Sequence, residues 1–151
     1  MEYKIVTLES QTALAIRDTC TFAELGAKFG EIYSEIGAYL KANSIKPAGY
    51  PFGIYHSVSD EKVDLEAGIP VTGEPAGSGR IYTMQTYFGK AANTAFVGPY
   101  EQLSKAWKDF AELVDADNHK LAGPCFEVYV TDPEEEPDSS KWITELYTPV
   151  E

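Results

Sequence analysis

The sequence predicts an α+β fold: a duplicated β-α-β-β module that forms a largely antiparallel sheet with two long helices on one face. One observation is the motif G-x-x-F-x-(I/V)-Y, which occurs at residues 49–55 and again at residues 123–129. Another is the motif E-x-x-x-P-V, which occurs at residues 66–71 and 145–150. A long helical pattern precedes each G-x-x-F motif, so both halves of the chain show the same order of elements.

The repeat suggests a single domain over residues 1–151, composed of the halves 1–72 and 80–151. The segment between the halves, residues 73–79, reads G-E-P-A-G-S-G and predicts a turn-rich linker. Two similar halves usually bury an interface, and a groove at such an interface is a common place for a ligand. We therefore expect a ligand cleft between the halves.

The first half begins with a strand over residues 3–8 and 11–16, bent at its centre. Thr21 and Glu24 match the capping box that opens a helix, and Asn43 marks its end. Apolar residues recur along this helix at steps of three and four and mark one apolar face: Phe22, Leu25, Phe29, Ile32, Ile36 and Leu40. Two further strands are expected over residues 50–57 and 62–69.

The second half repeats this order. Strands are expected over residues 80–88 and 91–97, and Gly98-Pro99 introduces the second helix. The inward stripe of that helix is predicted to contain Leu103, Ala106, Trp107, Phe110, Leu113 and Val114. The last two strands are expected over residues 125–131 and 142–148.

Composition restricts the classes of partner. The net charge is −12, from 24 acidic and 12 basic residues, and 44% of the residues are hydrophobic. The hydrophobic content supports a folded core. The acidic excess argues against nucleic acids and anionic membrane surfaces, because both require clustered Lys and Arg. It favours a cationic ligand or a solvated acidic surface.

The N-terminal residues contain no signal-peptide pattern, and no segment approaches the roughly 20 apolar residues that span a bilayer. The two cysteines, Cys20 and Cys125, fit a reducing compartment better than a disulfide framework. These observations predict a cytoplasmic protein.

Two Glu-x-Tyr sequences occur in neighbouring predicted strands: Glu127 with Tyr129, and Glu145 with Tyr147. Because side chains alternate across a strand, each Glu shares a face with its Tyr. The apolar residues that alternate with Glu127 and Tyr129 are expected to face the helices. We therefore predict two carboxylates and two phenols on one surface away from the core.

In the first half, Tyr55 and Glu66 are the expected members of the same surface. Gly53 and Gly68 occupy the positions where the second half carries a Glu and a Tyr, so we expect open space and a cavity there. Trp107 is a core candidate that could also reach the edge of this cavity.

Acidic and aromatic groups in one cavity suit a lipophilic cation, which gains ion pairing and cation–π contacts of about 0.5–2 kcal/mol per ring. The same residues also fit the solvated face of an antiparallel sheet. A further interpretation is acid–base catalysis, in which Glu activates water or Tyr donates a proton. The pattern alone does not separate these interpretations.

Nothing in the sequence indicates a metal or a cofactor. His56 and His119 lack the spacing of metal ligands. Residues 77–80 lack the setting and the Lys of a phosphate-binding loop. The acidic residues 132–140 read as a solvated loop.

Three segments carry a family resemblance: F-V-G-P-Y-E-Q-L at residues 96–103, E-V-Y-V-T-D-P at 127–133, and W-I-T-E-L-Y-T-P-V at 142–150. Together with E-x-x-x-P-V at 66–71, they resemble the GyrI-like small-molecule-binding family. This family is also known as the effector-binding domain of AraC-type and related multidrug-responsive bacterial regulators of transcription.

The resemblance implies a duplicated β-α-β-β fold that binds lipophilic, often cationic, drugs or effectors in a cleft between its halves. An acidic residue on a central strand meets the charge of the ligand in such proteins. The matching positions are Glu145 and Tyr147, with Glu127 and Tyr129 beside them, and the choice of primary carboxylate stays open. We therefore expect a standalone binding protein for lipophilic cations.

The family also suggests two other functions. Some standalone relatives resemble hydrolases of strained, cyclopropane-containing toxins, which would make Glu145 and Tyr147 the catalytic pair. Others resemble gyrase-inhibiting proteins, so gyrase is a candidate partner. The first predicted strand begins at the N-terminus and leaves no residues for a helix-turn-helix, so we expect no direct DNA binding.

Overall fold

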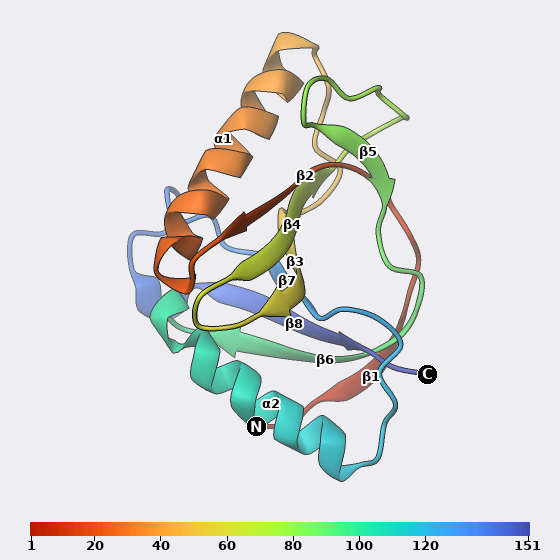
Figure 1. Ribbon diagram of the computed structural model, residues 1–151, viewed down its shortest axis with the longest axis vertical. Coiled ribbons are helices and arrows are strands. Elements are labelled where there is room, and N and C mark those ends of the chain that lie inside the picture. Colours follow the sequence, from red (N-terminus) through yellow and green to blue (C-terminus); the bar gives the residue numbers. More distant parts are fainter. The chain divides into compact units, whose positions relative to one another are not determined.

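The computed structural model describes residues 1–151 and confirms the α+β class, with eight strands and two long helices. The chain forms two compact units (Figure 1). We call Glu9–Tyr87 the middle unit, and Met1–Leu8 with Phe88–Glu151 the terminal unit. Each unit contains an antiparallel four-stranded sheet and one long helix. No helix combines the length and the hydrophobicity needed to cross a bilayer.

The sheet of the middle unit has the strand order β3-β4-β2-β5. Its strands are β2 (Thr12–Cys20), β3 (Phe52–Val58), β4 (Val63–Pro70) and β5 (Tyr82–Gln85). Helix α1 (Leu25–Ala42) packs on one face of this sheet. The register pairs Leu14 with Ile69 and Ile16 with Ala67, so these four side chains share the face toward α1.

Helix α1 follows a short 3₁₀ turn, and the predicted capping box is confirmed. The backbone N–H of Glu24 donates to the Thr21 hydroxyl, and the Glu24 carboxylate accepts from the Thr21 backbone N–H. Ile32, Ile36 and Leu40 of the predicted stripe are buried against the sheet. Burying a side chain of this size stabilises the fold by about 1.5–3 kcal/mol, so this stripe holds α1 in place.

Arg80 ties the segment between β4 and β5 to the rest of the middle unit. Its guanidinium lies 2.8 Å from Asp18 on β2, and 3.0 Å from each of Glu31 and Glu35 on α1. The planar guanidinium presents several donors in fixed directions, so one Arg can bridge three carboxylates. Within the predicted linker itself, the Ala76 carbonyl accepts a hydrogen bond from the Tyr39 hydroxyl on α1, so the linker belongs to the middle unit.

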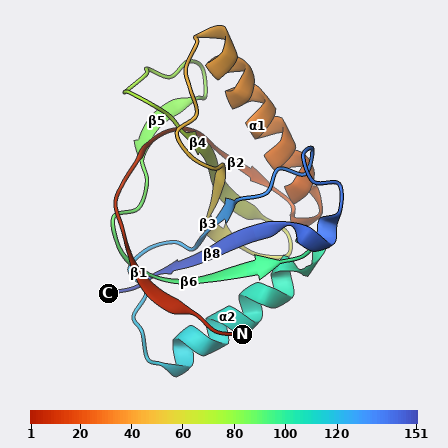
Figure 2. The ribbon, with the colours of Figure 1, turned by 180° about the vertical axis from the view of Figure 1, so that it is seen from behind.

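The sheet of the terminal unit has the strand order β1-β6-β8-β7. Its strands are β1 (Lys4–Leu8), β6 (Gly89–Val97), β7 (Phe126–Tyr129) and β8 (Ile143–Pro149). Figure 2 shows β1, β6 and β8 side by side. Helix α2 (Leu103–Ala116) covers one face through Leu103, Ala106, Phe110 and Val114, which form a core with Leu146.

The first predicted strand is two strands in the structure. The strand is interrupted between β1 and β2, because the two segments have different partners. Strand β1 pairs with β6, with Ile5 opposite Ala92, whereas β2 pairs with β4. Strand β5 also joins the middle unit, where it pairs with β2. The compact units therefore differ from the sequence halves 1–72 and 80–151 at β1 and at residues 73–87.

Candidate functional site

The register of β7 against β8 decides which side chains share a face. Glu127 lies opposite Leu146, and Tyr129 lies opposite Thr144. Since Leu146 belongs to the core under α2, Glu127 and Tyr129 point toward α2. The expectation that they face away from the helices is therefore wrong. Alternation assigns Phe126, expected to face the helices, to the opposite face.

Glu127 is a buried carboxylate that accepts hydrogen bonds from Trp107 and Tyr129. Its side chain is only 2% exposed. The indole Nε1–H of Trp107, on α2, donates to Oε2 at 2.6 Å, and the Tyr129 hydroxyl donates to Oε1 at 2.7 Å. Both carboxylate oxygens of Glu127 therefore accept a hydrogen bond from an aromatic side chain of the terminal unit.

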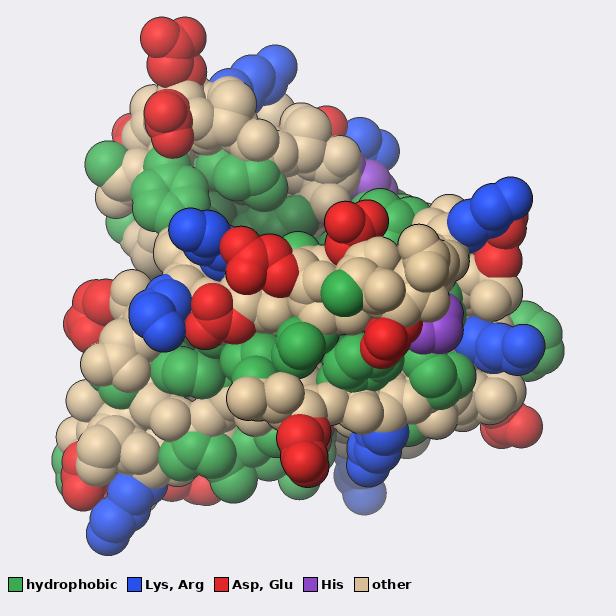
Figure 3. All heavy atoms as spheres, turned by 90° about the horizontal axis from the view of Figure 1, so that it is seen from below, with side chains coloured by type: hydrophobic (Ala, Val, Ile, Leu, Met, Phe, Trp, Pro, Cys, Tyr) green, Lys and Arg blue, Asp and Glu red, His purple; other side chains and the backbone are tan.

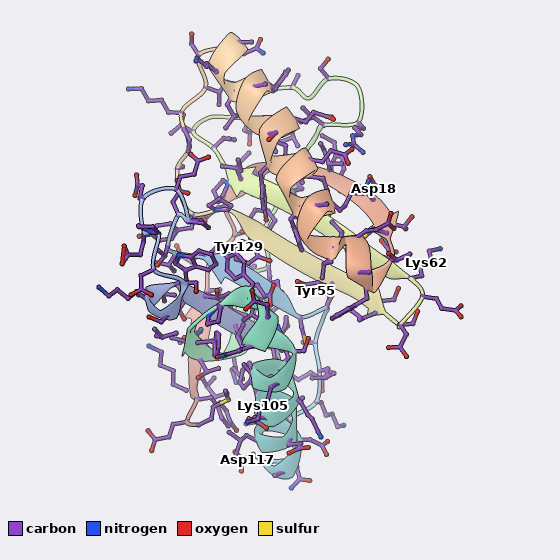
Figure 4. All side chains as sticks on the ribbon, turned by 90° about the vertical axis from the view of Figure 1, so that its left-hand side faces the viewer. Asp18, Tyr55, Lys62, Lys105, Asp117 and Tyr129 are labelled. Atoms are coloured by element: carbon purple, nitrogen blue, oxygen red, sulfur yellow. The ribbon has the colours of Figure 1, made fainter.

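Aromatic rings continue outward from this carboxylate. The Tyr100 ring lies 5.8 Å from the Tyr129 ring and 4.8 Å from the Trp142 ring, measured between centroids. Burial raises the pKa of the Tyr100 hydroxyl, and the charges of Asp132 and Glu127 raise it further. Tyr100 therefore lies within the electrostatic field of Glu127. In Figure 4, Tyr129 lies beside the N-terminal end of α2.

Tyr100 was absent from the predicted site. The usable signal was its spacing from Trp107, since residues seven apart lie on the same face of a helix. Tyr100 lies in the short 3₁₀ turn Tyr100–Gln102 directly before α2, and its ring meets that of Tyr129.

Glu145 and Tyr147 lie on the other face of the same sheet. They alternate with Leu146, which faces α2. The Asn93 side-chain amide donates to Glu145 Oε2 at 2.9 Å. The Tyr147 ring stacks on Phe126 at 4.8 Å with an interplanar angle of 10°. Burial raises the pKa of Tyr147, and Glu145 adds to this shift. The structure therefore separates the two Glu-x-Tyr pairs instead of joining them.

The middle unit separates its predicted site residues in the same way. Glu66 accepts a hydrogen bond from the Tyr82 hydroxyl and lies 2.9 Å from Nε2 of His56. Burial raises the pKa of Tyr82 well above its usual value, and Glu66 raises it further. Tyr55 lies opposite Leu65 in the register and packs on the α1 side, with its ring 6.2 Å from that of Phe29. Glu66 therefore lies on the face opposite Tyr55.

The space expected at Gly68 is filled. A Cβ at this position would lie 2.7 Å from the Leu14 carbonyl oxygen and 2.7 Å from Cζ of Phe52. Phe52 is the repeat counterpart of Phe126, whose ring stacks on Tyr147 in the terminal unit. In the middle unit the corresponding ring closes over a glycine, so Gly68 contributes no cavity.

We predict that Gly68→Ala destabilises the protein by about 1–3 kcal/mol, because the added methyl group meets backbone that has little room to move. The matched control is Gly30→Ala on α1, where a Cβ meets nothing within 4 Å. That change should stabilise the helix by about 0.5–1 kcal/mol. Urea unfolding of both variants measures the difference, and a Gly68→Ala protein as stable as the wild type would contradict the close packing.

The structure offers no evident metal ligands. No group of three or more His, Cys, Asp or Glu side chains is placed to hold a metal ion. Both cysteines are free thiols. On the face drawn in Figure 3, acidic and basic side chains are interspersed and no large basic patch forms.

The complete chain, residues 1–151, matches the family described as the GyrI-like small molecule binding domain. This chain belongs to the GyrI-like family. Among curated proteins, no sequence matches it. The chain is therefore a small-molecule-binding domain by its family.

Solved structures share the fold of this GyrI-like domain. The EcmrR C-terminal domain superimposes with a TM-score of 0.88 at 21% identity, over 99% of this chain and 97% of that one. SAV2435 bound to tetraphenylphosphonium gives 0.72 at 18% identity, over 100% and 94%. A hydrolase from Listeria innocua gives 0.66 at 12% identity, over 99% and 92%. At these identities the likeness concerns the fold.

The GyrI-like domain also matches EcmrR in a complex with DNA, with a TM-score of 0.89 and 19% identity. It covers 99% of this chain but only 57% of that EcmrR chain. This GyrI-like domain therefore corresponds to only part of that EcmrR chain.

Proposed function

We propose that this GyrI-like domain binds lipophilic cations, with Glu127 as the charged contact. The observation that carries the proposal is the placement of a 2% exposed carboxylate among aromatic side chains, with Trp107 and Tyr129 donating to it. A structural neighbour of the same fold, SAV2435, is bound to the cation tetraphenylphosphonium. That neighbour supports lipophilic cations as the class of ligand. The side chains around Glu127 support this carboxylate as the point of contact.

Desolvation of the carboxylate favours the entry of a cation. A buried carboxylate has lost much of its hydration, and an entering cation compensates for that loss. Trp107, Tyr129, Tyr100 and Trp142 add ring faces, each worth about 0.5–2 kcal/mol to a desolvated cation. A hydrophobic cation also gives up little hydration of its own, so the balance favours binding.

Binding requires that a side chain moves, because Glu127 is almost completely covered. Tyr100 is the best candidate for this movement: it is 37% exposed, and its ring meets that of Tyr129 edge-on. A partly exposed ring loses fewer packing contacts on moving than a buried one. We propose that the Tyr100 ring swings aside as the ligand enters.

A matched pair of ions tests the proposal. Tetraphenylphosphonium and tetraphenylborate have nearly the same shape and opposite charges. We expect the phosphonium to bind and the borate to bind roughly a hundredfold more weakly, because the carboxylate attracts one and repels the other. Titration calorimetry at pH 7 measures both. Equal affinities would rule out a charged contact.

Hydrolysis of a strained electrophile is the second candidate function. Its support is the contact between the Glu127 carboxylate and the Tyr129 hydroxyl at 2.7 Å, a pairing suited to proton transfer. Product formation from cyclopropane-containing substrates, lost in Glu127→Gln with binding retained, would favour this function. Binding without turnover would favour the first.

Other expectations from the sequence stay predictions. They are a cytoplasmic location, a relation to AraC-type multidrug-responsive regulators, contact with gyrase, and the absence of direct DNA binding. Glu145, Tyr147, Tyr55 and Glu66 likewise remain candidate ligand contacts, to be compared with Glu127 by mutation.

A further inference from the structure

We infer that Thr144 determines specificity at the proposed site, and that its buried hydroxyl donates a hydrogen bond to an oxygen of the ligand. Thr144 can have this role only if the proposed function holds, because the role concerns which lipophilic cations the site prefers. The Thr144 side chain is fully buried on β8, yet its hydroxyl has no hydrogen-bond partner within the protein. Buried polar groups are almost always paired, so an unpaired hydroxyl is a candidate contact for a ligand.

The register places this hydroxyl beside the residues of the proposed site. Thr144 lies opposite Tyr129 of β7 on one side and opposite Phe96 of β6 on the other, and it shares the face of Leu146. Because Glu127 lies opposite Leu146, it is a diagonal neighbour of Thr144. Diagonal neighbours on one sheet face are about 7–8 Å apart. A ligand oxygen about one phenyl ring away from the cationic centre would therefore reach Thr144.

The repeat shows that the fold does not require a hydroxyl at this position. When the two E-x-x-x-P-V motifs are aligned, the counterpart of Thr144 is Leu65, which is fully buried in the core under α1. Leu65 lies opposite Tyr55, the counterpart of Tyr129. An apolar residue thus fills this place in the middle unit, and the polar one occurs in the unit that carries Glu127. An unpaired buried hydroxyl lowers stability, and a hydrogen bond to a bound ligand would offset that loss.

Thr144→Val tests whether the hydroxyl is unpaired in the free protein. Valine keeps the shape and removes the hydroxyl, so we expect the midpoint of urea unfolding to rise by about 0.5 M. Thr148→Val is the matched control on the same strand and face, because the Thr148 hydroxyl is buried but lies 3.7 Å from Cys125 Sγ. The midpoint of the control should stay the same or fall. A Thr144→Val midpoint no higher than that of the wild type would show that the hydroxyl already has a partner, such as a buried water, and would overturn the inference.

Matched ligands test the specificity itself. (Methoxyphenyl)triphenylphosphonium and (ethylphenyl)triphenylphosphonium have nearly the same shape and the same charge, and only the first carries an ether oxygen. The ortho, meta and para isomers place that oxygen at different distances from the phosphorus. In titration calorimetry, we expect at least one methoxy isomer to bind the wild type about fivefold more tightly than its ethyl counterpart.

The ratio of the two affinities identifies the residue responsible. The preference for the methoxy compound should disappear in Thr144→Val and persist in Thr148→Val, since only the first change removes the proposed donor. A wild type without any methoxy preference, or a preference that persists in Thr144→Val, would overturn the inference. Failure of tetraphenylphosphonium itself to bind the wild type would instead contradict the proposed function, so the two failures are distinguishable.

Discussion

Replacing Phe110 with alanine should reduce the free energy of unfolding by about 3–5 kcal/mol, because the change leaves a large cavity in a packed core. Phe110 is fully buried at the centre of the α2 core. Its ring lies 5.7 Å from the ring of Trp107 and 5.9 Å from that of Tyr3. The neighbouring rings are too rigid to fill the space completely, so much of the loss should persist.

The same change should weaken cation binding, since Phe110 supports the indole that donates to Glu127. Urea unfolding measures the stability, and titration with tetraphenylphosphonium measures the binding. Phe88→Ala is the matched control: it removes the same side chain in the same unit, where Phe88 is 72% exposed. We expect that control to change the stability by no more than about 0.5 kcal/mol. Equal losses in the two variants would contradict the assignment of the core.

Local sequence patterns predicted most of the helices and strands of the fold. The capping box at Thr21 and the stripe with Ile32, Ile36 and Leu40 depend on neighbours three or four residues away, and both are present in the structure. Pairing of edge strands depends on distant segments. The partner of β1 is β6, more than 80 residues later, and no local pattern specifies that choice.

The site was predicted less well for a related reason. Alternation correctly indicates that Glu127 and Tyr129 share a face, but it does not say which face meets the helix. Hydrophobicity suggested that Phe126 would turn inward. The decisive contact is the Trp107 indole, which stabilises a carboxylate on the buried side. A donor on another element is visible only once the helix is in place.

The cavity that the repeat predicted at Gly68 is also absent. Sequence comparison of the two motifs suggested empty space where Tyr147 has a glycine counterpart. The structure instead places the Phe52 ring and the Leu14 carbonyl there. A missing side chain predicts a cavity only if the surrounding groups cannot close over it.

Glu127→Gln tests the central claim most directly, because glutamine keeps the shape of the side chain and removes its charge. The amide keeps one acceptor oxygen and places an NH2 group where either Trp107 or Tyr129 already donates, so the ligand loses its charged contact in a less favourable setting. Loss of a buried charged partner should cost about 2 kcal/mol or more in binding. Glu145→Gln, on the opposite face, is the matched control.

The measurement is the affinity of both variants and the wild type for tetraphenylphosphonium by titration calorimetry, with circular dichroism as a check on folding. We predict that Glu127→Gln binds at least roughly thirtyfold more weakly, whereas Glu145→Gln stays close to the wild type. A folded Glu127→Gln protein with unchanged affinity, together with a large loss in Glu145→Gln, would contradict the account and move the ligand to the other face of the sheet.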